Sequence, residues 1–188
     1  MTTEISSLFS FILSILTIFG MIGIVVFVVA LFYQKKQWSR KLIYFVGKNS
    51  LVLTFAVALA GTIGSLIYSN IIGYAPCELC WIQRIFLYSQ VIILATALWR
   101  KDKGVIPYSI DLSICGALVA LYQVYTTQLG GFSFTQCTAL EGACSKLFVN
   151  EWGFITIPFM ALVAFLLMFF IMVNGKIHHK TSTHHHTS

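Results

Sequence analysis

The feature that most constrains this chain is a series of long apolar runs separated by short polar connectors. The first run, residues 8–33, is almost continuously apolar and is longer than the roughly 20 residues that a helix needs to cross a bilayer. Four further runs follow, at about residues 51–72, 82–98, 105–127 and 152–173. Because backbone polar groups in lipid must be satisfied within the segment, each run is predicted to be a membrane-spanning helix.

Composition agrees with this prediction. The chain is 58% hydrophobic and 10% charged, whereas soluble domains are about 45–50% apolar and about 25% charged. One small globule cannot bury such an excess, so the partner of the chain is the lipid bilayer. The net charge of +6 comes from short basic clusters between the runs. This pattern is typical of membrane orientation, and we expect no nucleic-acid binding.

The basic residues also predict which side each connector occupies. Ten of the twelve lysines and arginines fall on one side of five spans, in the connector 34–50, the loop after the third span and the tail 174–188. Only Arg84 and Lys146 fall on the other side. The positive-inside rule therefore predicts an extracytoplasmic N-terminus and a cytoplasmic C-terminus in a multi-pass cell-membrane protein.

Two cysteines stand at the boundary between the second and third spans. Cys77 and Cys80 follow a turn signal at residues 73–76, and Arg84 comes one helical turn after Cys80. We expect the helix to start at about Trp81. A Cys-x-x-Cys pair near a helix N-terminus and a cation is typical of a redox dithiol. The alternatives are a structural disulfide or half of a zinc site. No second close ligand pair completes a zinc site, so we predict no metal.

A second cysteine pair lies in the longest loop between spans, residues 128–151. Cys137 and Cys144 fall on the same predicted side as Cys77 and Cys80, where disulfides persist. One pair at the lipid boundary and one on a loop would allow a thiol–disulfide relay, and two structural staples are the alternative. The fifth cysteine, Cys115, is expected to be a small buried hydrophobe within the fourth span.

These motifs resemble the DsbB/BdbC family of membrane disulfide-forming oxidoreductases. The resemblance covers about residues 45–175. It rests on Cys77-Glu78-Leu79-Cys80-Trp81-Ile82-Gln83-Arg84 and on the pair Cys137-Thr138 and Cys144-Ser145. It implies an all-α membrane fold, a four-helix bundle over 51–173 with the extracytoplasmic loop 128–151. The additional N-terminal helix, within residues 1–33, departs from the family pattern. The basic cytoplasmic connector 34–50 and the His-containing cytoplasmic tail 174–188 flank the bundle.

The resemblance also implies a function. A reduced DsbA-like extracytoplasmic thiol oxidase would attack the loop disulfide at Cys137, and electrons would pass through Cys144 to the Cys77–Cys80 pair. Cys80 would lie next to a membrane quinone, menaquinone or ubiquinone, with Arg84 holding or polarising it. The chain would thus be a quinone-dependent thiol–disulfide oxidoreductase that supports disulfide bond formation.

Several alternatives stay open at this point. A quinone reductase of the vitamin K epoxide reductase type shares the relay, but there the loop pair precedes the Cys-x-x-Cys. A non-enzymatic membrane scaffold would carry only structural disulfides. Arg84 could be a snorkelling interfacial arginine. We further expect Asp111 to pair with Arg100 or Lys103, Pro158 to kink the last span, and the histidine tail to lack fixed geometry.

Overall fold

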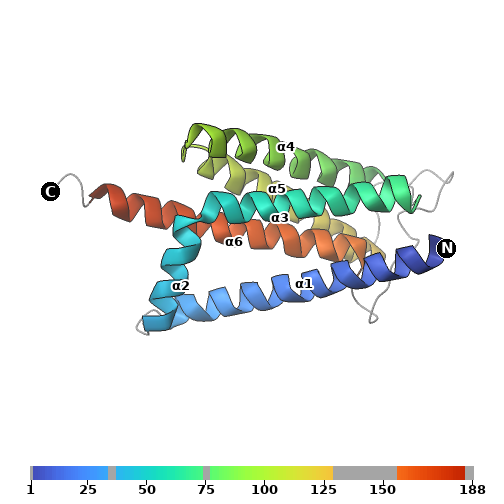
Figure 1. The fold of residues 1–188 in the computed structure, drawn as a ribbon, viewed down its shortest axis with the longest axis horizontal. Helices are drawn as coiled ribbons and strands as arrows, with labels where there is room; N and C mark the ends of the chain where they lie inside the picture. Colours follow the sequence, from blue (N-terminus) through green and yellow to red (C-terminus); the bar gives the residue numbers. More distant parts are fainter. Residues whose placement is uncertain (1, 34–36, 74–76, 129–155, 185–188) are drawn as a thin grey trace.

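The computed structural model describes residues 2–33, 37–73, 77–128 and 156–184, and all regular structure in these ranges is helical. The elements are α1 (Thr2–Phe32), α2 (Gln37–Lys48), α3 (Ser50–Leu66), the π-helical turn η1 (Ile67–Ile71), α4 (Glu78–Arg100), α5 (Ile106–Gln128) and α6 (Ile157–His184). The long helices run alongside one another, and α2 crosses one end of them (Figure 1).

Five helical segments are long and apolar enough to cross a membrane. They are Leu8–Phe32, Ser50–Ile71, Glu78–Arg100, Ile106–Thr127 and Ile157–His179. Their outer faces expose large apolar side chains such as Phe19, Ile92 and Leu118. Such a surface suits lipid rather than water. The predicted fold class, an all-α membrane bundle with an additional N-terminal helix, is confirmed.

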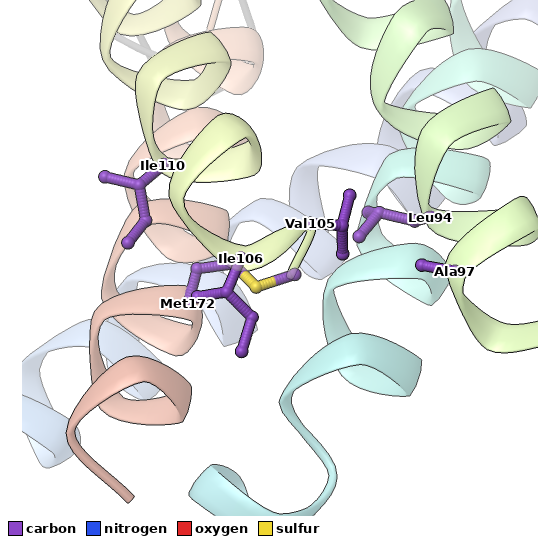
Figure 2. Close-up of a cluster of buried hydrophobic side chains, with 6 residues drawn as sticks. All are labelled: Leu94, Ala97, Val105, Ile106, Ile110 and Met172. Carbon is purple, nitrogen blue, oxygen red and sulfur yellow. The ribbon is translucent and has the colours of Figure 1, made fainter. Parts of the chain in front are cut away.

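The core lies between α3, α4, α5 and α6. One cluster of buried side chains forms where α4 leads into α5 (Figure 2), and it contains Leu94, Ala97, Val105, Ile106, Ile110 and Met172. A second cluster lies midway along the helices and contains Ala58, Leu87, Ala120, Phe165 and Met168. Each cluster draws residues from helices far apart in the sequence, so the four helices form one packed unit.

Small residues set the closest helix contacts. A Cβ at Gly61 would stand 3.2 Å from a methyl of Leu87, and one at Gly64 would stand 3.4 Å from Leu13. On α5, a Cβ at Gly116 would overlap the ring of Phe165. Missing side chains therefore let the helices approach more closely than larger residues would allow.

The two N-terminal helices attach to α6 at different points. Gly20 of α1 lies against Val163, and the rings of Phe27 and Phe170 have centroids 6.4 Å apart. At the other end of α6, the Asn174 side-chain amide donates to the carbonyl of Ile43 in α2 at 2.8 Å. Helix α2 thus joins the additional helix to the bundle.

Helix α6 differs from expectation at both ends. Pro158 lies in its first turn, where a missing N–H costs no helical hydrogen bond, so it starts the helix instead of kinking it. The helix then continues to His184, well past residue 173. The side chain of His178 packs against Gly47 and against Tyr44, with ring centroids 5.0 Å apart. The expectation of a tail without fixed geometry is therefore wrong as far as His184.

Two expectations for α5 are also wrong. Cys115 is exposed on the outer face of the helix, not buried in the bundle. Asp111 is exposed as well, in a lipid-facing groove that it shares with Tyr108. Within the described parts of the chain Asp111 makes no ion pair, so the predicted partners Arg100 and Lys103 are not used.

Candidate dithiol site at one end of the bundle

The first cysteine pair lies at the end of the bundle where α4 begins, called here the cysteine end. Cys77 is the N-cap of α4, and its carbonyl accepts the first helical hydrogen bond, from the N–H of Trp81. Cys80 therefore lies in the first turn, and the helix starts three residues earlier than predicted. The sulfurs of the two cysteines lie 3.0 Å apart, in hydrogen-bonding contact. The first N–H groups of α4 have no acceptor within the helix, and their partial positive charge favours negative charge on the cysteine pair.

A buried amide lies within hydrogen-bonding distance of both sulfurs. The Nε2 of Gln123 on α5 is 3.3 Å from the Cys77 sulfur and 3.4 Å from the Cys80 sulfur. Its Oε1 accepts a hydrogen bond from Gln83 Nε2 at 2.8 Å. Gln123 is 3% exposed and Gln83 is 8% exposed, so water does not compete for these bonds. The amide N–H groups of Gln123 are placed to stabilise electron-rich sulfur.

Arg84 is buried one turn beyond Cys80, with 8% of its side chain exposed. Its Nε donates to the hydroxyl of Ser65 at 2.8 Å, and its Nη2 donates to the Ser65 carbonyl at 2.7 Å. The guanidinium carbon also lies 5.2 Å from the ring centroid of Trp81. A snorkelling arginine would keep its head in water, so that alternative is wrong.

The charge of Arg84 is not neutralised by a carboxylate in the part of the chain that is described. Its two bonds to Ser65 go to neutral acceptors and use two of the five guanidinium N–H donors. A cation buried beside neutral partners is costly, and it favours an electron-rich group nearby. The cysteine end therefore combines a dithiol, an amide donor and a guanidinium with further N–H donors that Ser65 does not use.

Comparison with known proteins identifies the family. A family model described as Disulfide bond formation protein DsbB matches residues 47–174. The chain belongs to this family. Membership in the DsbB family implies thiol–disulfide oxidoreductase activity and a role in disulfide formation at a membrane. No solved structure is matched.

Individual relatives of the DsbB family agree. Disulfide bond formation protein C of Bacillus subtilis is 40% identical over 128 residues, which cover 66% of this chain and 93% of the relative. The SPbeta prophage-derived disulfide bond formation protein B of the same organism is 42% identical, covering 65% and 82%. A probable disulfide formation protein of Coxiella burnetii is 36% identical, covering 66% and 85%. The family segment begins after α1.

The structure brings together some of the predicted residues and leaves others undescribed. Cys77, Cys80 and Arg84 lie within the first two turns of α4 or at its cap. Cys137 and Cys144 lie outside the described residues. Reasoning from the sequence missed Gln123 and Ser65.

The missed residues carried a signal in the sequence. Gln123 is a polar side chain inside an apolar span, which is itself a sign of function or of interhelical bonding. The same signal marks Gln90, which is fully buried deeper in the bundle. There it donates to the Ser113 hydroxyl at 2.7 Å and accepts from the Ser109 hydroxyl at 2.6 Å. Only the fold distinguishes the glutamine at the thiols from the one remote from them.

Proposed function

We propose that this protein reoxidises an extracytoplasmic DsbA-like thiol oxidase and passes the electrons to a membrane quinone, menaquinone or ubiquinone. The observation that carries the proposal is the dithiol of Cys77 and Cys80 beside the buried guanidinium of Arg84, inside a membrane-spanning helix. A structural disulfide would need neither a buried cation one helical turn away nor an amide donor at its sulfurs.

The distribution of charge supports an extracytoplasmic position for the cysteine end. Arg84 is the one lysine or arginine of the described residues at that end of the bundle. The opposite end carries Arg40, Lys41, Lys48, Arg100, Lys101, Lys103 and Lys176. The positive-inside rule assigns the basic end to the cytoplasm. The cysteines then face the compartment in which disulfides form.

The proposed relay conserves electrons and protons. The thiolate of the partner attacks the Cys137–Cys144 disulfide at Cys137, and the second thiol of the partner then resolves the mixed disulfide. The partner leaves oxidised, and the loop pair is left as two thiols. These thiols reduce a Cys77–Cys80 disulfide by the same exchange. When bound, the quinone supplies the sink for the resulting two electrons and two protons.

The residues at the cysteine end fit a quinone. Its carbonyl oxygens accept hydrogen bonds, and Arg84 has donors that Ser65 does not use. Its ring is apolar, and Trp81, Ile82 and Ile85 expose apolar surface beside Arg84 on the outside of α4. Arg84 would hold the carbonyl and favour negative charge that develops there. Gln123 would stabilise the cysteine sulfur that carries negative charge during exchange.

The test is the thiol state of the four cysteines in lipid vesicles, read by alkylation with a mass tag. With quinone present and a reduced thioredoxin-fold partner added, we expect continuous partner oxidation. With quinone removed, the four cysteines should accumulate as thiols. The Cys115→Ser variant is the matched control, because Cys115 lies on the outer face of α5, away from the pair. Cysteines that stay oxidised without quinone while the reduced partner is present would establish static disulfides instead.

A further inference from the structure

Helix α1 lies outside the family segment, yet it packs on the turn that holds Arg84. The family match begins at residue 47, whereas α1 ends at Phe32. Most of α1 faces α6, as at Gly20 and Val163. Its residues 9–13, however, contact the end of α3 and η1 on both sides of Ser65. This contact is not needed to close the four-helix bundle.

The helical hydrogen-bonding pattern changes shortly after Ser65, where α3 ends at Leu66 and η1 begins at Ile67. Beyond it, η1 hydrogen bonds reach five residues back, as from the N–H of Ile72 to the carbonyl of Ile67 at 3.0 Å. Such a change of ladder leaves carbonyls of the preceding turn available to other donors. Two carbonyls here accept side-chain donors: Ser65 accepts from Arg84 at 2.7 Å, and Leu66 accepts from Ser69 at 3.3 Å. The carbonyl that binds Arg84 thus lies in α3, two residues before the π-helical turn.

Three residues of α1 contact this region. Leu13 covers Gly64, the residue before Ser65. Phe9 packs edge-on against Tyr68 of η1, with ring centroids 5.4 Å apart. The hydroxyl of Tyr68 donates to the hydroxyl of Ser10 at 3.2 Å. Tyr68 is 6% exposed and Ser10 is 4% exposed, so this bond joins the two helices within a dry contact.

We propose that α1 positions Arg84. Through Ser10 and Tyr68 it holds η1, and η1 in turn fixes the adjoining end of α3, which presents the Ser65 carbonyl and hydroxyl to the guanidinium. Ser10, Tyr68 and Ser65 are thus positioning residues, and they act on the redox site only through Arg84. The additional helix adjusts how the cation faces its electron-rich partner. Only the link to quinone rests on the proposed function.

The first experiment reads the position of Arg84 without quinone or turnover. The guanidinium lies 5.2 Å from the Trp81 ring, so Trp81 emission reports its placement. A single-tryptophan parent is made by changing the other three tryptophans to phenylalanine: Trp38, Trp99 and Trp152. Ser10→Ala and Tyr68→Phe should shift Trp81 emission in the direction that Arg84→Ala does. Ser10→Thr, which keeps a hydroxyl, should restore the emission of the parent.

Ser14→Ala is the matched control. Ser14 is 2% exposed on the same helix, but its hydroxyl has no hydrogen-bond partner among the described residues. It should leave Trp81 emission unchanged. In an Arg84→Ala background, Ser10→Ala should add nothing. A Ser10→Ala shift that persists in that background, or no shift at all when Arg84→Ala gives one, would overturn the proposal.

The second experiment measures the KM for a soluble quinone analogue. Losing one buried hydrogen bond should raise KM about three- to tenfold in Ser10→Ala, with kcat retained, and only while Arg84 is present. If Arg84→Ala raises KM and Ser10→Ala does not, positioning by α1 is refuted and the proposed function stands. If emission responds as expected but Arg84→Ala leaves KM unchanged, quinone binding at Arg84 is refuted and the positioning stands.

Discussion

Gln83 donates a hydrogen bond of 2.8 Å to the side-chain oxygen of Gln123, and this bond turns the amide nitrogen of Gln123 toward the sulfurs of Cys77 and Cys80. The two glutamines belong to different helices, α4 and α5. The dithiol is therefore attached to the neighbouring helix by a polar contact that contains no charge. This contact stabilises whichever state of the pair carries more electron density on sulfur.

Replacing Gln123 by leucine should make the Cys77–Cys80 pair a weaker oxidant. The reduced pair loses its amide donors, whereas a disulfide has less need of them. At about 1–2 kcal/mol for the lost bonds, the reduction potential should fall by roughly 20–40 mV. The measurement is a redox titration of the pair in thiol buffers with alkylation readout. Gln90→Leu removes an equally buried glutamine remote from the thiols and should leave the potential unchanged; an equal fall in both variants would contradict the assignment.

Arg84→Ala should weaken quinone use while leaving Cys77 and Cys80 able to form a disulfide. A hydrogen bond to a charged group contributes about 1.5–3 kcal/mol, so KM for quinone should rise roughly 10- to 150-fold. Arg84→Lys keeps the charge but cannot form the paired bonds to Ser65. Its KM should therefore lie between that of the unchanged protein and that of Arg84→Ala. Steady-state kinetics with a quinone analogue gives both values. An unchanged quinone dependence in Arg84→Ala would remove Arg84 from the site.

Cys144→Ser should trap a mixed disulfide between Cys137 and the thioredoxin-fold partner. Without Cys144 the loop has no internal disulfide, and Cys137 is free to pair with the oxidase. Non-reducing electrophoresis should show an adduct that disappears on reduction. Adding Cys115→Ser should leave the adduct in place. If the adduct instead requires Cys77 or Cys80, the roles of the two pairs are misassigned.

Gly116→Ala should destabilise the bundle, because the new methyl group would overlap the ring of Phe165. Overpacking of this kind costs about 1–3 kcal/mol, which is measurable as a lower midpoint of thermal unfolding in detergent. Gly23→Ala is the same substitution at a site where the new methyl group would lie 3.9 Å from Leu167, an ordinary contact distance, and it should be tolerated. Combining Gly116→Ala with Phe165→Leu should recover much of the loss. Equal effects at the two glycines would contradict this packing.

Sequence reasoning located the spans and placed Cys77, Cys80 and Arg84 near the start of a helix, because these positions depend on local pattern. Hydropathy locates a helix in lipid, and the spacing of two cysteines identifies a Cys-x-x-Cys pair. It misplaced the start of α4, because Glu78, Leu79 and Cys80 form the first turn before the apolar run begins. It also failed for residues whose role depends on a partner far along the chain. Ser65 and Arg84 are 19 positions apart, and Gln83 and Gln123 are 40 apart.

The end of α6 illustrates a further reason. Its polar sequence after residue 173 reads as a tail, but Asn174 and His178 dock on α2, which extends the helix. Composition alone assigns such residues to water. For Cys115 the prediction was burial, but the residue is exposed. A helix in lipid also has an outer apolar face, and a small apolar side chain is equally stable there.

The additional helix makes the number of candidate membrane spans odd, five instead of four. The four-helix bundle starts and ends at the same end, where α2 lies, whereas α1 begins at the cysteine end (Figure 1). Five crossings, the number of candidate spans, would place the beginning of α1 and the end of α6 on opposite sides of the membrane. A reporter that fluoresces only in the cytoplasm and a protease-accessible epitope outside could then be carried by the two ends of one polypeptide, without inverting the bundle between them.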